Sequence, residues 1–336
     1  MRLLRSIAVL LTGAAILSAA SKTLDIHFID VEGGQATLIV TPNKESLLVD
    51  AGWPGVDGRD AKRIVDAAKK AGLAKIDFLA ITHYHRDHVG GVEQLANAFP
   101  VGTFVDHGPN TETGKPAEEL STSYMRAVAK GKHLVVRPGD RIPLKGVDVR
   151  VVVARGDALA KALPGGGQSN QFCAGAAKKA DDPSENARSL GVVVQYGKFR
   201  FADFGDLTWN KEIDLVCPNN RIGKVDVYLT THHGMDASGP PAIVHALQPR
   251  VAIMNNGSKK GGAPPAWQVI KSSPGFEDIW QVHFAVAGGR ENNADEAFIA
   301  NMDESTGHGL SLSAERTGAF KVANARNGKT KAYAAR

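Results

Sequence analysis

The sequence predicts an α/β fold built from layered sheets. Short apolar strands alternate with amphipathic helices in both halves of the 336-residue chain, a pattern typical of sheets covered by helices. Hydrophobic residues make up 43% of the chain and charged residues 22%, which is ordinary for a globular protein with a sizeable core. No repeat and no clean linker divides the chain, so we expect a single domain over residues 21–336.

The N-terminal half begins with three predicted strands and continues as strand–helix units. The strands cover residues 24–31, 35–40 and 46–52. Residues 59–72 carry apolar side chains at helical spacing and end in glycine, which predicts an amphipathic helix. The alternation continues as a strand at 76–82, a helix at 92–99, a strand at 101–108 and a helix at 117–131.

Residues 154–188 interrupt this pattern. They are rich in Gly, Ala, Asn, Ser and Asp without a clear period, so we expect a long surface excursion of the kind that can cover an active site. Beyond it we expect a hairpin through Gly197, alternating strands and helices, and a closing hairpin. The expected strands are 189–197, 198–206, 225–234, 250–256, 278–286, 309–315 and 319–325, and the expected helices are 240–249 and 264–273.

Residues 1–20 have the features of a secretory signal peptide. Arg2 and Arg5 precede an apolar run, and the small residues Ser18 and Ala20 permit cleavage after Ala20. The alternative is an uncleaved membrane anchor, although the run is short for a spanning helix. We therefore expect a periplasmic or secreted protein with no transmembrane segment in the mature chain.

The charge of the chain does not single out a partner. Loss of the two signal-peptide arginines lowers the net charge from +5 to about +3. A nucleic-acid partner is therefore not supported by a basic patch, since no basic run with interleaved aromatic residues stands out.

The two cysteines leave two alternatives open. Cys173 and Cys217 can form a disulfide in an oxidising compartment, or they can remain as two separate buried thiols. Neither lies in a Cys-x-x-Cys or Cys-His pattern, so we do not expect them to bind metal.

The densest polar cluster follows the predicted strand at 76–82. The stretch ITHYHRDHVGG places His83, His85, Asp87 and His88 within six positions. Burying these groups without partners costs several kcal/mol, and an exposed loop has no need of three imidazoles. A metal site explains the cluster best.

Two further clusters occupy equivalent places. Asp206 ends the strand expected at 198–206, and the doublet His232–His233 ends the strand expected at 225–234. The carboxyl ends of neighbouring strands meet at one edge of a sheet, where α/β folds place ligands. We expect the three clusters to converge.

The spacing of these residues suits two metal ions. A His-x-His pair can reach one ion, and the following Asp-His can reach a second about 3.5 Å away. Neutral imidazole favours zinc, and one carboxylate can bridge two ions, although manganese or iron can occupy the same ligands. Such a pair forms a hydrolytic centre that provides hydroxide near neutral pH.

The stretch THYHRDHVGG resembles the His-x-His-x-Asp-His signature of the metallo-β-lactamase superfamily. The order of motifs over roughly residues 24–290 looks most like the hydrolase domain of DNA-uptake competence (ComEC-type) proteins and like phosphorylcholine esterase. This resemblance implies a four-layer αβ/βα sandwich and an enzyme, a binuclear zinc hydrolase that uses a metal-bridging hydroxide.

By the same resemblance, two zinc ions share one bridging carboxylate, Asp206. His83 and His85 would hold the first ion, and Asp87 and His88 the second. One or both histidines of the doublet would complete the two sets of ligands, and which of them does so stays open. Asp87 is also the implied catalytic residue, since it would accept a hydrogen bond from the hydroxide and fix its direction.

Four further residues are candidate members of the site. Many superfamily members have another histidine between the signature and the bridging aspartate, and His107 is the candidate here, either as a ligand or as a pocket residue. Asp50, in LLVDAG, matches a position that usually orients a ligand histidine. Asn186 matches an asparagine of the competence-type domains and is a candidate substrate contact or a plain turn residue, and His283 is a pocket candidate at a late strand end.

The substrate classes rank in a definite order. Phosphodiesters and other phosphoesters come first, because the proteins with this motif order act on phosphate esters or accompany DNA. A β-lactamase or lactonase type of acyl hydrolase comes second, and a non-catalytic zinc-containing binding module third. A lysine or arginine beside the ions favours phosphate, and Lys259 and Lys260 are the candidates unless they form an exposed turn.

Overall fold

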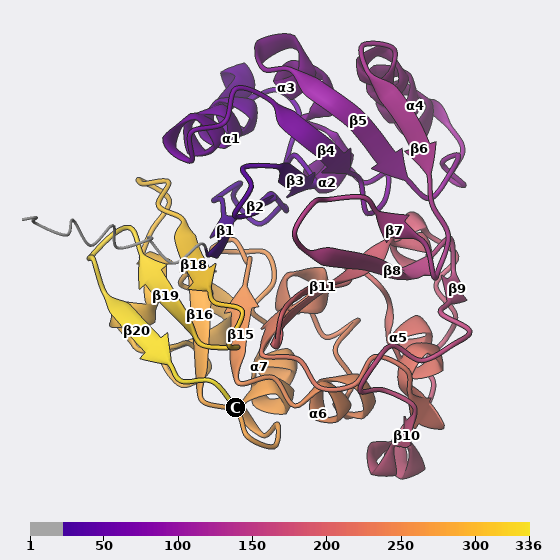
Figure 1. Cartoon of the computed structure of the whole chain (residues 1–336), viewed down its shortest axis with the longest axis vertical. Helices are drawn as coiled ribbons and strands as arrows, with labels where there is room; N and C mark the ends of the chain where they lie inside the picture. Colours follow the sequence, from indigo (N-terminus) through magenta and orange to yellow (C-terminus); the bar gives the residue numbers. More distant parts are fainter. Residues whose placement is uncertain (1–22) are drawn as a thin grey trace, which may run out of the picture.

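Two nine-stranded sheets pack face to face and are covered by helices on their outer faces in the computed structural model, which describes residues 23–336 (Figure 1). This architecture confirms the predicted α/β class and the four-layer sandwich. The predicted signal peptide lies outside the described residues. Between residues 23 and 336, no helix is long and apolar enough to cross a membrane.

The first sheet joins an antiparallel part to a parallel part. In spatial order its strands are β20 (Thr330–Tyr333), β19 (Phe320–Asn324), β18 (Leu310–Ala314), β1 (Leu24–Phe28), β2 (Thr37–Val40), β3 (Ser46–Val49), β4 (Ile76–Ala80), β5 (Val101–Asp106) and β6 (Lys132–Val135). Pairing is antiparallel from β20 to β3 and parallel from β3 to β6. The closing hairpin β18–β19 therefore extends the sheet that the N-terminal strands begin.

The second sheet has the same mixed character. In spatial order its strands are β17 (Ile299–Asn301), β16 (Asp278–His283), β15 (Val251–Met254), β14 (Val227–Leu229), β12 (Phe199–Asp203), β11 (Gly191–Tyr196), β8 (Asp148–Ala154) and β7 (Arg141–Ile142), with β9 (Asp157–Ala158) paired to β8. Strands β12 and β14 pair in parallel, so their carboxyl ends lie at one edge. The predicted hairpin β11–β12 is confirmed by the antiparallel pairing of Tyr196 with Phe199.

Helices cover the outer face of each sheet (Figure 1). On the first sheet they are α1 (Arg59–Lys70), α3 (Val92–Ala98) and α4 (Lys115–Val128), and on the second they are α5 (Trp209–Val216), α6 (Pro241–Leu247) and α7 (Pro264–Lys271). Helix α1 shows why they pack this way, because Ile64, Val65 and Ala68 recur at helical spacing and are all buried.

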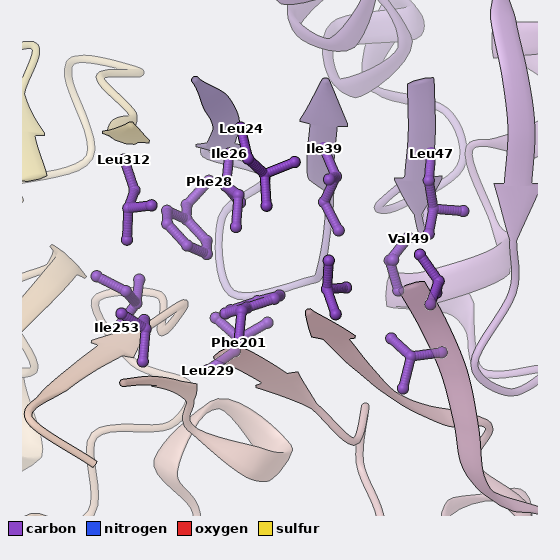
Figure 2. Close-up of a cluster of buried hydrophobic side chains, with 14 of the residues drawn as sticks. Leu24, Ile26, Phe28, Ile39, Leu47, Val49, Phe201, Leu229, Ile253 and Leu312 are labelled. Atoms are coloured by element: carbon purple, nitrogen blue, oxygen red, sulfur yellow. The ribbon is translucent and has the colours of Figure 1, made fainter. Parts of the chain in front are cut away.

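The main core lies between the two sheets. Leu24, Ile26 and Phe28 alternate along β1 with half-buried residues, so they share one face of the strand. That face points at side chains of the second sheet, including Phe201 and Leu229 (Figure 2). Each fully buried side chain of this size contributes about 1.5–3 kcal/mol of transfer free energy, so this core holds the two halves together.

The 154–188 segment is fastened to the second sheet. Cys173 forms a disulfide with Cys217 at the end of α5, so the pairing alternative is correct and the alternative of separate thiols is wrong. Nearby, the Trp209 indole N–H donates to the Ala177 carbonyl at 2.9 Å, and the Lys179 ammonium lies 3.8 Å from the Trp209 ring centre. The excursion is thus held on the surface at several points.

Strand β8, helix α5 and strand β20 are absent from the predicted elements. For β8 the signal was present, because Val149, Val151, Val152 and Val153 form an apolar run. Helix α5 has eight residues, and no element was predicted over them. Strand β20 pairs through its backbone with β19 at the edge of the first sheet, and its mixed composition gives little strand signal.

Candidate metal centre

The predicted metal ligands come from loops that follow three strands. After β4, residues 81–85 lead into the short helix α2 (Arg86–Val89), and together they carry the histidine cluster. Asp206 lies three residues beyond the end of β12. The doublet lies in a 3-10 turn (Thr231–Gly234) just after β14. The structure brings all seven residues of the predicted motif to one place, at the strand ends of both sheets.

Four of these residues form a compact group of donors. Asp87 Oδ2 lies 3.2 Å from His88 Nε2 and 3.2 Å from His233 Nε2. Asp206 lies 3.3 Å from the same two nitrogens, through Oδ2 and Oδ1 respectively. The four residues are buried, and their donor atoms all lie within 4.8 Å of one another. Four donors at this spacing can surround one cation.

Two further imidazoles lie near the Asp206 carboxylate, and a third lies beside one of them. His232 Nε2 is 3.5 Å and His83 Nε2 is 4.0 Å from Asp206 Oδ2. The ring of His85 is 4.6 Å from that of His83, measured between centroids. These three histidines form a second group of imidazoles beside the first. The doublet is therefore divided, with His233 in the first group and His232 in the second.

Each imidazole is also held through its other ring nitrogen. In four of the five, Nδ1 makes this contact while Nε2 is directed at the carboxylates. The Nδ1 contacts are His83 to Thr82 Oγ1 at 3.0 Å, His88 to Asp50 Oδ2 at 2.7 Å, His232 to Ser238 Oγ at 3.2 Å and His233 to the Asn255 carbonyl at 3.3 Å. Ligand imidazoles are usually oriented in this way, and the structure places Asp50 where the sequence suggests.

The donor set fits a divalent cation. Within residues 23–336, His83 Nε2 and Asp206 Oδ1 are buried and make no hydrogen bond, and such atoms are costly without a partner. His88 Nε2 and His233 Nε2 lie 3.3 Å apart with carboxylate oxygens on both. A cation bound by imidazole nitrogens and carboxylate oxygens would satisfy these atoms together.

The local electrostatics differ from one ligand to another. Burial alone would lower the pKa of His88, but the charges of Asp206, Asp87 and Asp50 outweigh it and raise that pKa well above its usual value. Burial lowers the pKa of His83 well below its usual value, and burial also lowers the pKa of His232. Burial alone would raise the pKa of the Asp206 carboxyl, but the surrounding imidazoles outweigh it and hold that pKa well below its usual range. Neutral imidazoles around an ionised carboxylate are the forms that bind metal.

The backbone is strained where it presents these groups. His232 and His233 have φ values of 56° and 55°, and Asp50 has a φ of 61°. The left-handed conformation costs about 1–3 kcal/mol for each such residue and is concentrated at functional sites. Gly205 has a φ of 55°, and a Cβ there would lie 2.7 Å from that of Thr82, so glycine permits the close approach of the Asp206 loop to Thr82.

Three other candidates lie in separate contacts. His107 Nε2 is 3.0 Å from Glu185 Oε2, and both side chains are buried. His283 Nε2 is 2.8 Å from Asp30 Oδ1. Asn186 is the second residue of the 3-10 turn Glu185–Arg188, and its side-chain Oδ1 is buried without a hydrogen bond among the described residues.

Lys260 and Glu112 lie against the centre. The Lys260 ammonium donates to Asp87 Oδ2 and lies 5.2 Å from the centre of the Trp53 ring. Glu112 Oε1 lies 3.0 Å from His85 Nε2. Lys260 was one of the two lysines that the sequence offered. Glu112 was not predicted, because nothing in its neighbourhood along the chain marks it.

Comparison with known proteins agrees with this geometry. Residues 29–167 match the family model described as the metallo-beta-lactamase superfamily. ComE operon protein 3 of Bacillus subtilis (strain 168) is 24% identical over 265 residues, which cover 74% of this chain and 30% of that protein. Hydroxyacylglutathione hydrolase of Alkalilimnicola ehrlichii is 41% identical over 58 residues, covering 17% of this chain and 21% of that protein. The chain thus spans less than a third of the length of either relative.

Among solved structures, the metallo-beta-lactamase fold protein YhfI from Bacillus subtilis is similar, with 12% sequence identity and a TM-score of 0.46 over 76% of this chain and 95% of that one. The match to the family model covers the histidine cluster and its preceding strands. Residues 29–167 thus carry a domain of the metallo-beta-lactamase superfamily, a family of metal-dependent hydrolases.

Proposed function

We propose that this protein is an exported metal-dependent hydrolase with two zinc ions that cleaves phosphoesters, with phosphodiesters as the first candidates. The observation that carries the choice of substrate is Lys260, whose ammonium lies against Asp87. Its side chain is 30% exposed, so it can meet a substrate. Lys259 is different, because it is 79% exposed and lies 3.4 Å from Glu304.

The metal ligands divide into two groups that share Asp206. His83, His85 and His232 would hold one cation, and Asp87, His88 and His233 the other. The pair would supply hydroxide at neutral pH and positive charge at the attacked atom. Five imidazoles and two carboxylates favour zinc over the harder ions.

The protein's own residues then bind and orient the substrate. Negative charge spreads over the phosphoryl oxygens during phosphoryl transfer, and a lysine ammonium can bind those oxygens as a point charge. A fixed positive charge beside the centre needs no reorganisation as that charge develops. The side of the metal centre that carries Lys260 therefore suits a substrate with an anionic group at the reacting atom better than it suits a neutral acyl compound.

Export is supported by the disulfide. A bond between Cys173 and Cys217 persists in an oxidising compartment such as the periplasm or the exterior. The apolar run and cleavage pattern of residues 1–20 agree with this location.

A substrate screen tests the proposed class. The zinc-loaded protein is assayed with bis-p-nitrophenyl phosphate, nitrocefin and a chromogenic lactone. Cleavage of the phosphodiester alone is the expected result. Cleavage of nitrocefin or the lactone alone would instead place the enzyme among acyl hydrolases, and no turnover of any substrate by fully zinc-loaded protein would support a binding module.

Lys260 and Lys259 form a matched pair of variants. We expect Lys260→Ala to lower kcat/KM for the phosphodiester by about 10²-fold, as expected for loss of one group that stabilises developing charge. Lys259→Ala should leave that value unchanged, because its side chain is paired with Glu304 in solvent. Steady-state rates of the two variants measure the difference. If the two substitutions change kcat/KM equally, or if neither changes it, Lys260 does not bind the substrate.

A further inference from the structure

We infer that Glu112 is a positioning residue that sets the affinity of the cation site formed by His83, His85 and His232, by orienting His85. The inference rests on the proposed metal centre and concerns a residue that no sequence pattern marks. Glu112 Oε1 lies 3.0 Å from His85 Nε2. The same oxygen accepts the backbone N–H of Glu185 at 3.0 Å.

These two contacts determine the tautomer of His85. An ionised carboxylate has only acceptors, so the ring nitrogen that faces it must carry the proton. Nδ1 is then the nitrogen with the free lone pair, and it is the one left for a metal. Without Glu112, the neutral ring can also place its proton on Nδ1, and that form cannot bind a cation through Nδ1.

Glu112 is held in place by its neighbours. Its backbone N–H donates to Asn110 Oδ1 at 2.9 Å. The adjacent Thr111 donates to Glu185 Oε1 through its N–H at 2.7 Å and its hydroxyl at 2.6 Å. Because these contacts fix the backbone up to Glu112, the carboxylate meets His85 without ordering a free loop, which lowers the entropy cost of the contact.

Glu185 ties this loop to the histidine cluster. It is completely buried, and its Oε2 accepts the N–H of Tyr84, the residue between His83 and His85, at 3.3 Å. His83 and His85 are therefore supported by three segments that are distant in sequence. These are the histidine cluster that contains them, the loop at 110–112 and the end of the 154–188 segment.

A comparison with the other donor group supports the role. Asp50 makes the corresponding contact with His88 at 2.7 Å, and it is completely buried. Glu112 makes it with His85 from a position that is 33% exposed. Each donor group thus has one imidazole oriented by a carboxylate, and such partners change metal affinity by about 10- to 100-fold when they are removed.

The test measures zinc binding rather than turnover. The full chain is titrated with zinc in competition with a chromogenic chelator, for the wild type, Glu112→Gln, Glu112→Ala and the control Glu119→Gln. Glu119 lies in α4, and its side chain is 66% exposed. Circular dichroism and the unfolding midpoint establish that each variant folds.

We expect Glu112→Ala to weaken one of the two zinc sites by about 10- to 100-fold and to leave the other unchanged. Glu112→Gln should lose less, because its amide oxygen can still accept from Nε2–H, and Glu119→Gln should match the wild type. Equal affinities at both sites in wild type, Glu112→Gln and Glu112→Ala would overturn the role of Glu112 and leave the proposed function standing. A wild-type protein that binds no zinc would instead overturn the proposed function. If Glu112→Ala does not fold, Glu112→Gln decides on its own.

Discussion

The Asp206→Asn variant is expected to fold, to lose tight zinc binding and to lose at least roughly 10²-fold in phosphodiester turnover. Asparagine keeps the volume of the side chain but removes the charge. Among residues 23–336, Asp206 is the one carboxylate that lies within 4.0 Å of ring nitrogens from both donor groups. Its loss therefore weakens both cation sites, whereas the loss of a single imidazole weakens mainly one.

Zinc content after gel filtration and the rate on bis-p-nitrophenyl phosphate measure the effect. Asp214→Asn is the matched control, because Asp214 lies in α5 and pairs with Lys178 at the surface. An Asp206→Asn protein with two tightly bound zinc ions and a wild-type rate would show that this carboxylate does not bridge the centre.

Glu212→Gln is expected to stabilise the protein at alkaline pH. Burial raises the pKa of Glu212 to about 8, against the lowering effect of hydrogen bonds from the Gly239 N–H and the Thr231 hydroxyl. In the unfolded chain a glutamate has its ordinary pKa of 4.5. The folded state therefore keeps a proton that the unfolded state releases between these two pH values.

The sign of the effect follows from proton linkage. The stabilisation from protonated Glu212 is fully present below pH 4.5 and is lost as the pH rises to about 8. Each pH unit in this window costs about 1.4 kcal/mol of unfolding free energy. Glutamine keeps an acceptor for the Gly239 N–H, which lies 2.6 Å from the carboxylate. Its amide does not titrate, so the variant loses no proton as the pH rises.

Urea unfolding at pH 5, 6.5 and 8 tests this linkage. The difference in unfolding free energy between Glu212→Gln and the wild type should grow with pH and reach several kcal/mol at pH 8. Glu119→Gln should follow the wild type at each pH, because its side chain is mostly exposed. Parallel pH profiles for Glu212→Gln and wild type would show that Glu212 is ionised in the folded protein.

The predicted parts of the fold and site are those that local pattern determines. The alternation along β1 is visible in the sequence because buried and half-buried residues follow the period of two. The histidine cluster is visible because one short loop supplies four ligands. Asp206 and the doublet were found because each follows a strand, and the parallel pairing of β12 and β14 brings them together.

The parts that escaped prediction depend on contacts between distant segments. Glu112 meets His85 across 27 positions, and Glu185 meets His107 across 78. A single glutamate in a polar loop carries no periodic signal, so only the folded chain reveals its partner. The disulfide was left open for the same reason, because two isolated cysteines do not show whether their backbones approach.

Anomalous diffraction at the zinc absorption edge, from crystals of the zinc-loaded protein, tests the central claim most directly. Two peaks are predicted in contact with Asp206, one bound by Asp87, His88 and His233 and the other by His83, His85 and His232. A zinc-soaked crystal with no anomalous peak at Asp206, or with zinc only at other residues, would contradict the account.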